Sequence, residues 1–119
     1  MENNPDHIII TCFTASPFVK SYDKPKNVIE GDPLSLECQA WGYPHVNVTW
    51  YAEGVAIVAD GVRIKLSNGT NLENSLLRIE NMEFDDQGIF TCVAENDAGI
   101  NNETIQIRVK GKTFKIASL

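Results

Sequence analysis

Short stretches of alternating apolar and polar residues cover much of the chain, and turn-forming residues separate them. The alternation runs through residues 34–40, 46–51, 64–66, 77–79, 90–95 and 105–109. Successive side chains of a β-strand point to opposite faces, so one set in each stretch is expected to face a core and the other set solvent. Several short strands spaced in this way predict an all-β sandwich.

The breaks between these stretches have turn chemistry. Glu30-Gly31-Asp32-Pro33 precedes the first predicted strand, and Asp97-Ala98-Gly99 separates the last two. Asn68-Gly69 lies between two other strands and suits a hairpin turn that needs positive φ. We expect at most a single helical turn, over residues 82–87.

The 119 residues have the usual size of one domain. We predict that the folded domain covers residues 16–110. Residues 1–15 match no predicted strand and are interpreted as a leader, a linker or the end of a preceding segment, and residues 111–119 as a C-terminal linker. The acidic, polar residues after Met1 do not resemble a signal peptide, and no apolar run reaches the roughly 18–20 residues that a membrane helix needs. For a surface protein, this indicates a segment of a longer chain.

Two runs of residues carry a family resemblance. In the first, Cys38 is followed by Gly42, Pro44 and Trp50. In the second, Asp86-x-Gly88-x-Phe90-x-Cys92 continues into Ala94-x-Asn96-x-x-Gly99. Together they resemble the I-set of the immunoglobulin superfamily, as found in neural adhesion molecules, receptor ectodomains and muscle filament proteins. The resemblance covers about residues 17–110. It implies an immunoglobulin-like β-sandwich of two antiparallel sheets with Greek-key connections.

The resemblance also implies the contacts that hold the core. Cys38 on one sheet would form a disulfide with Cys92 on the other, and Trp50 would pack against it. Closing a loop of about 55 residues is worth about 4 kcal/mol on the chain-entropy model. Arg63 would form a salt bridge with Asp86 at the base of the sandwich.

One residue departs from the family pattern. The family usually has a tyrosine two residues before the second cysteine, whose hydroxyl bonds to the backbone. This chain has Phe90 there. The ring is still expected to fill the core, and the lost hydrogen bond costs about 1 kcal/mol.

The chemical inventory argues against several classes of function. The net charge of −6 disfavours nucleic acid, whose binding depends on Lys and Arg, and also an anionic membrane surface. The two histidines, His7 and His45, fit no catalytic triad, so we expect no enzyme and no cofactor. Glu83, Asp85 and Asp86 are interpreted as solvated or salt-bridged carboxylates and not as a metal site, because Ca²⁺ needs six or more oxygens from a defined loop.

Three Asn-x-Thr triplets are candidate N-glycosylation sites, at Asn47, Asn68 and Asn102. The resemblance puts Asn47 and Asn102 on the outer face of one sheet, near one end, where glycans would shield part of that face. A protein partner would then use the other sheet, an end loop, or the lower part of the shielded sheet. The residues expected in that lower part are Tyr51, Val93, Gln106 and Arg108.

Two further features have competing interpretations. Trp41 and Tyr43, expected in the turn after the first strand, are candidate interaction anchors. The favoured interpretation is that they cover the open end of the sandwich or pack on a neighbouring domain. The third cysteine, Cys12, is a free thiol, pairs with a cysteine outside this segment, or links two copies of the chain.

The resemblance implies an extracellular recognition module of a cell adhesion molecule or receptor. It would bind another protein or a copy of itself, with membrane attachment only through parts of the parent chain outside this sequence. A secreted ligand-binding protein also fits. The alternative is an intracellular structural domain of a muscle or cytoskeletal filament protein, in which the cysteines stay reduced.

Overall fold

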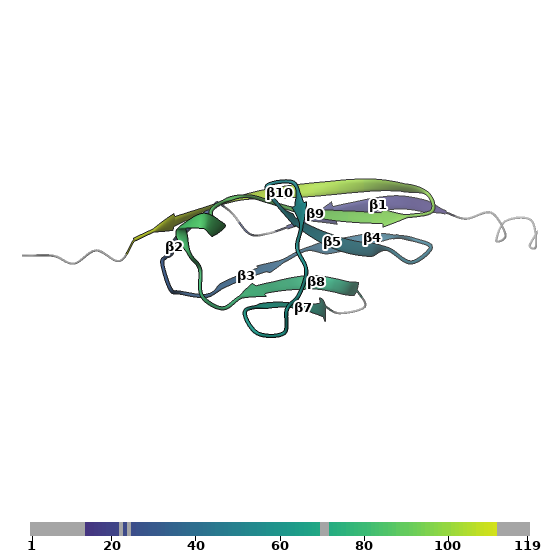
Figure 1. Ribbon diagram of the computed structural model, residues 1–119. Coiled ribbons are helices and arrows are strands. Elements are labelled where there is room, and N and C mark those ends of the chain that lie inside the picture. Colours follow the sequence, from purple (N-terminus) through teal and green to yellow (C-terminus); the bar gives the residue numbers. More distant parts are fainter. Residues whose placement is uncertain (1–13, 22, 24, 70–71, 112–119) are drawn as a thin grey trace, which may run out of the picture.

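The computed structural model describes residues 14–21, 23, 25–69 and 72–111. These residues form strands and one short 3-10 helix (Figure 1). The elements are β1 Ala15–Lys20, β2 Lys26–Ile29, β3 Leu34–Glu37, β4 Gln39–Tyr43, β5 Asn47–Ala52, β6 Val55–Ala56, β7 Ile64–Gly69, β8 Leu72–Ile79, η1 Phe84–Asp86, β9 Gly88–Asn96 and β10 Gly99–Lys110.

The strands form two layers, as the sequence predicts. In one layer β9 lies between β5 and β10, β6 extends the β5 edge, and β2 adds to the β10 edge. In the other layer β8 lies between β3 and β7 (Figure 1). β4, which follows β3 along the chain, pairs with β1 in a separate two-stranded sheet. The predicted all-β, immunoglobulin-like sandwich is confirmed. The structure differs from the expected pair of purely antiparallel sheets in two details: β2 runs parallel to β10, and a single parallel bridge between Asn47 and Glu73 joins the layers.

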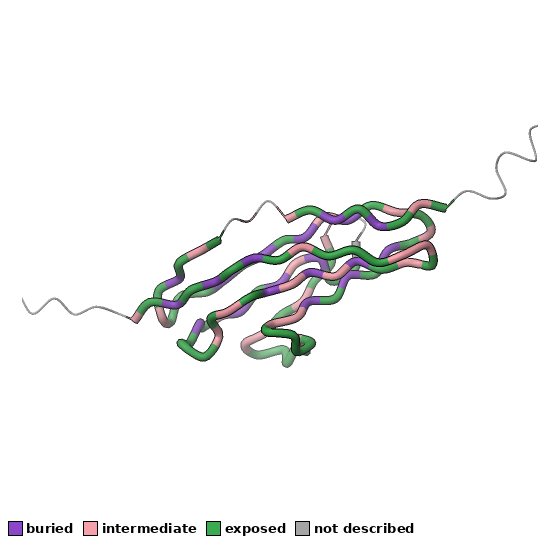
Figure 2. The backbone as a smooth tube through the Cα atoms, turned by 90° about the horizontal axis from the view of Figure 1, so that it is seen from above, coloured by how far each residue is buried: buried purple, intermediate pink, exposed green. Residues whose placement is uncertain are grey.

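The core lies between the layers and follows the predicted alternation. In β3, Leu34 and Leu36 are buried while Ser35 and Glu37 are exposed. Buried positions alternate with partly buried ones along β9, and with exposed ones along the second half of β10 (Figure 2). The largest buried side chain is that of Trp50. Burial of one face of strands such as β3 and β9 therefore fixes their register, because a slip of one residue would turn the apolar set to solvent.

The alternation does not predict β1 and β2, which precede the first predicted strand. β1 begins at Ala15, one residue before the expected start of the domain, and buries Pro17 and Val19. β2 buries only Val28. Each strand is held by its partner, β4 for β1 and β10 for β2. Short strands of this kind carry too few apolar residues for a periodic signal.

Pairing with β1 also moves two aromatic residues out of the predicted turn. Trp41 and Tyr43 lie in β4, where Trp41 pairs with Phe18 and Tyr43 with Ala15. The expectation that they lie in a turn is therefore wrong. The strand extends to Tyr43 because β1 supplies a hydrogen-bonding partner for this part of the chain.

The Asn68-Gly69 pair is likewise not the hairpin turn that the sequence predicts. Both residues belong to β7, and Gly69 pairs with Leu72. The Gly69 N–H donates a hydrogen bond of 2.8 Å to the Ser75 hydroxyl. A Cβ atom on Gly69 would lie 2.3 Å from that oxygen, so a larger residue here would force the Ser75 hydroxyl to move.

Candidate functional site

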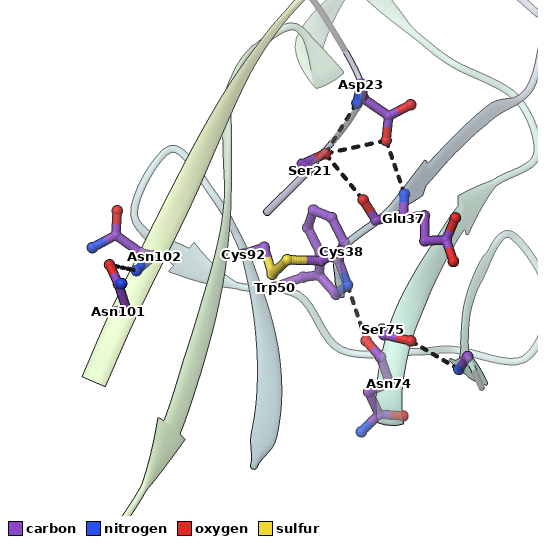
Figure 3. Close-up of a disulfide and its surroundings, with 11 residues drawn as sticks. Ser21, Asp23, Glu37, Cys38, Trp50, Asn74, Ser75, Cys92, Asn101 and Asn102 are labelled. Atoms are coloured by element: carbon purple, nitrogen blue, oxygen red, sulfur yellow. Dashed lines mark hydrogen bonds between the residues drawn. A yellow bond between two sulfur atoms is a disulfide. The ribbon is translucent and has the colours of Figure 1, made fainter. Parts of the chain in front are cut away.

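The centre of the sandwich is a disulfide between Cys38 and Cys92 (Figure 3). Cys38 lies between β3 and β4, and Cys92 lies in β9, directly opposite Trp50 in the ladder. All three side chains are fully buried. Phe90, two residues before Cys92, is also buried and fills the core as expected. The disulfide therefore links the two layers at the point where the largest aromatic side chain packs.

The Trp50 indole has a partner that the sequence does not reveal. Its N–H donates a hydrogen bond of 3.0 Å to the Asn74 carbonyl oxygen (Figure 3). Asn74 has a φ of 55°, a left-handed conformation that asparagine adopts more readily than most residues. The only sequence signal for this contact is the asparagine itself, within an otherwise strand-like segment.

Arg63 and Asp86 form a salt bridge at one end of the sandwich. The Arg63 guanidinium also donates to the Asn81 carbonyl oxygen, at 2.9 Å from Nε. The Asp86 carboxylate accepts a second hydrogen bond, of 2.7 Å, from the Glu83 N–H. The Asp86 carboxylate is therefore fixed by contacts with Arg63 and the Glu83 backbone. In the described part of the chain, no group of three or more His, Cys, Asp or Glu residues could hold a metal ion.

Asp60 orders the loop that leads into β7. Its carboxylate accepts hydrogen bonds from the backbone N–H groups of Val62, Arg63 and Ile64, all between 2.8 and 2.9 Å. The N–H of Ile64, followed by those of Val62 and Arg63, lowers the pKa of Asp60 below its ordinary value. The loop conformation places Arg63 for its contact with Asp86, and sequence analysis did not identify this anchor.

The three candidate glycosylation sites are all exposed. Asn47 begins β5 and is flanked by buried Val46 and Val48. Asn102 lies in β10, on the side of the strand away from the disulfide (Figure 3). Asn68 lies in β7, and its side-chain oxygen accepts a hydrogen bond of 3.0 Å from the Asn74 N–H. Asn68 therefore also supports the β8 backbone.

The expected lower part of the sheet face is smaller than the sequence suggests. Val93 pairs directly with Asn102, so it lies in the row of the candidate glycan and not below it. The expectation that Val93 lies in the lower part of the face is therefore wrong. Tyr51 pairs with Thr91 one row further down, and Gln106 and Arg108 follow along β10, both exposed. These three residues form what remains of the lower face.

Trp41 lies against a second aromatic residue on the outside of the β1–β4 pair. The ring centroids of Trp41 and Phe18 are 5.4 Å apart, with an interplanar angle of 31°. Trp41 is 50% exposed, Phe18 56% and Tyr43 57%. Sequence analysis did not identify Phe18 as a neighbour of Trp41, because its strand was not predicted.

A groove of about 410 Å³ lies on the outer face of β3, β8 and β7. Its lining includes Ser35, Leu76 and Arg78 and contains neither histidine nor cysteine. The Ser35 hydroxyl accepts a hydrogen bond of 2.9 Å from Arg78. The groove is thus a shallow surface lined by leucine, serine and charged side chains, in which the Ser35 hydroxyl contacts an arginine and not a base.

The chain is similar in sequence to part of several much longer proteins. It is 37% identical to neurofascin of Gallus gallus over 87 residues, which is 73% of this chain and 6% of that protein. It is 31% identical to contactin-3 of Homo sapiens over 97 residues, covering 82% of this chain and 9% of that protein. It is 32% identical to the cell adhesion molecule DSCAM of Gallus gallus over 110 residues, covering 89% of this chain and 5% of that protein. The chain thus spans only a small part of each relative.

Solved structures share the fold. Titin domain M7 superposes with a TM-score of 0.73 at 23% identity, covering 83% of this chain and 98% of that one. Extracellular domains 3–5 of Drosophila OTK give a TM-score of 0.67 at 27% identity, covering 82% of this chain and 32% of that one. Within the described residues, no helix is long and apolar enough to cross a membrane.

The family resemblance carried by the cysteine and tryptophan motifs is confirmed. The immunoglobulin I-set domain family matches residues 17–109, most of the chain. The sandwich, the buried disulfide and the tryptophan beside it fit the architecture of immunoglobulin domains. This chain therefore belongs to the immunoglobulin I-set domain family.

Proposed function

We propose that this chain is an extracellular recognition module of a cell adhesion molecule or receptor. The observation that carries the proposal is the fully buried disulfide between Cys38 and Cys92. Disulfides persist in oxidising environments such as the cell exterior and are rare in the cytosol. A domain held together by such a bond is suited to the outside of a cell.

Two further observations support this placement. The asparagines of all three Asn-x-Thr triplets are exposed, which is what glycosylation in the secretory pathway requires. The relatives above 30% identity include neurofascin, contactin-3 and a protein named as a cell adhesion molecule. Titin domain M7 has a lower identity, 23%, and its likeness concerns the fold alone.

In this proposal the domain acts by presenting side chains on a rigid frame. The disulfide and the close-packed core hold the strands, so the outer sheet faces change little on binding. The partner is another protein or a second copy of this chain. A nucleic-acid partner is disfavoured by the net charge of −6. Membrane attachment would come from other parts of the parent protein.

The location is tested with an antibody against this chain on cells that express the parent protein naturally. We expect the antibody to stain intact cells, or to detect the protein in their medium. An antibody against a cytosolic protein, applied in parallel, shows that the cells are sealed. Staining that appears only after permeabilisation would contradict the proposal and favour a filament domain.

Recognition is tested with beads that carry the chain secreted from eukaryotic cells. Aggregation of the beads with one another would indicate self-recognition. Binding to cells that lack the chain, abolished by protease treatment of those cells, would indicate a different protein partner. Beads that carry an unrelated immunoglobulin domain are the control. If the chain-coated beads behave like the control beads in both assays, recognition by this domain alone is refuted.

A further inference from the structure

We propose that Asn47 and Asn102 both carry N-linked glycans, and that the two glycans together cover one half of a sheet face. We call this half the upper face; it consists of Asn47, Thr49, Val93, Glu95, Ile100 and Asn102 on β5, β9 and β10. The inference rests on the proposed function, because N-glycans are added to proteins in the secretory pathway.

Both asparagines point to solvent for the same structural reason. Val46 and Val48 on either side of Asn47 are buried, so the intervening side chain faces outward. Asn102 pairs with Val93, whose neighbours Cys92 and Ala94 are buried. Thr49 and Thr104, which complete the two triplets, are exposed as well. Each triplet is therefore displayed on the outer face of the sheet.

The ladder places the two asparagines close together. Asn47 pairs with Glu95 and Asn102 pairs with Val93, two residues away on the same strand. They are separated by two strand spacings, about 10 Å, and by one row, about 7 Å, which puts them about 12 Å apart. A glycan is bulky compared with this distance, so sugars on both asparagines would meet over the central strand β9.

The surface between the asparagines suits a covering of this kind. Ile100, which pairs with Glu95, is 64% exposed. Val93 is half-buried in the neighbouring row. Glycans above them would shield these apolar side chains from contact with other proteins. Protein recognition would then be restricted to the lower face, at Tyr51, Gln106 and Arg108, and to the opposite sheet.

Occupancy is tested by the mass of the chain secreted from eukaryotic cells with a leader peptide. We expect Thr49→Ala and Thr104→Ala each to remove the mass of one glycan, because each change breaks a triplet and leaves its asparagine in place. In the unaltered chain, enzymatic glycan release converts a glycosylated asparagine to aspartate, which peptide masses detect. This second reading does not depend on how well a variant folds. If Asn47 or Asn102 is not converted, the proposal is wrong.

Coverage is tested by the rate at which a maleimide carrying a polyethylene glycol chain labels an introduced cysteine. In a Cys12→Ser background, Glu95→Cys places a thiol between the two asparagines, and Ser35→Cys places a control thiol on the opposite sheet. We expect labelling at position 95 to be several-fold faster after Thr49→Ala and Thr104→Ala are combined, and labelling at position 35 to be unchanged. Equal rates at position 95 with and without glycans would overturn the proposed coverage.

These outcomes separate the inference from the proposed function. A secreted chain with an intact disulfide and no glycan at Asn47 or Asn102 refutes the glycan pair and leaves the extracellular assignment standing. A chain whose native form contains Cys38 and Cys92 as free thiols contradicts both.

Discussion

The Trp50 indole reaches across the sandwich from β5 and donates its N–H to the Asn74 carbonyl oxygen in β8, at 3.0 Å. The Asn74 N–H is held in turn by the Asn68 side chain. Asn74 lies where β8 leaves its partner β3 and approaches β5, at the bridge between Asn47 and Glu73. The core tryptophan therefore stabilises the junction of the two layers in addition to packing on the disulfide.

We expect Trp50→Phe to lower the free energy of unfolding by about 2–4 kcal/mol. It removes buried volume and leaves the Asn74 carbonyl without its donor. Denaturant titration followed by circular dichroism measures the loss. The matched control is Trp41→Phe, which changes a half-exposed tryptophan and should cost less than about 1 kcal/mol. Equal losses in the two variants would contradict the assigned role of Trp50.

The contact between Gly69 and Ser75 makes a prediction about two coupled residues. A Cβ atom on Gly69 would lie 2.3 Å from the Ser75 hydroxyl oxygen but 3.6 Å from the Ser75 Cβ. Gly69→Ala should therefore cost about 1–3 kcal/mol through overpacking, and Ser75→Ala about 1 kcal/mol through the lost hydrogen bond. Because Ser75→Ala removes the clashing oxygen, the double variant should lose less than the sum. Additive losses in the double-mutant cycle would refute this close contact.

Asp60 predicts a dependence of stability on pH. Its pKa is lowered in the folded state, chiefly by the N–H of Ile64. The folded state therefore binds the proton less tightly than the unfolded state, and the charged carboxylate contributes stability above its unfolded pKa. That contribution is lost as the pH falls through the lower, folded pKa. Asp60→Ala should reduce the melting temperature at pH 7, and the difference from the unaltered chain should shrink below about pH 4.

Thermal melts of both chains at neutral and acidic pH measure this difference. Asp97→Ala, which removes an exposed carboxylate from the turn between β9 and β10, is the control and should change the melting temperature little at either pH. A difference between Asp60→Ala and the unaltered chain that grows as the pH falls would show that the sign of the effect is wrong.

The disulfide makes the largest single prediction about stability. It joins residues 54 positions apart in the sequence. On the chain-entropy model, reducing it should lower the free energy of unfolding by about 4 kcal/mol. Denaturant titration with and without reductant measures the loss. The same loss should appear in a Cys12→Ser variant, and its disappearance there would show that the stabilising bond involves Cys12.

The sequence predicts those strands in which burial of one face leaves a clear alternation. Leu34 and Leu36 against Ser35 and Glu37 are an example, and β3 follows from them. The sequence does not predict β1, because its two buried residues, Pro17 and Val19, are too few for a periodic signal. The strand forms only through pairing with β4, which is distant in sequence. Long-range pairing of this kind is not encoded in a local period.

The candidate site shows the same division. The exposure of Asn47 and Asn102 follows from their phase relative to buried neighbours, and the structure agrees. The position of Val93 beside Asn102 depends on the register between β9 and β10, which the sequence does not specify. The hydrogen bond of the Trp50 N–H depends on the left-handed backbone conformation of Asn74. The strand-like sequence around Asn74 does not predict this conformation.

The central claim is that this domain is held by a disulfide in an oxidising compartment. The most direct measurement counts the alkylated thiols of the native parent protein, isolated from the cells that make it. The protein is denatured and alkylated without reductant, and its peptides are analysed by mass spectrometry. We predict that Cys38 and Cys92 escape alkylation and are recovered as one disulfide-linked pair of peptides. Alkylation of both cysteines would contradict the extracellular assignment and favour a reduced, intracellular domain.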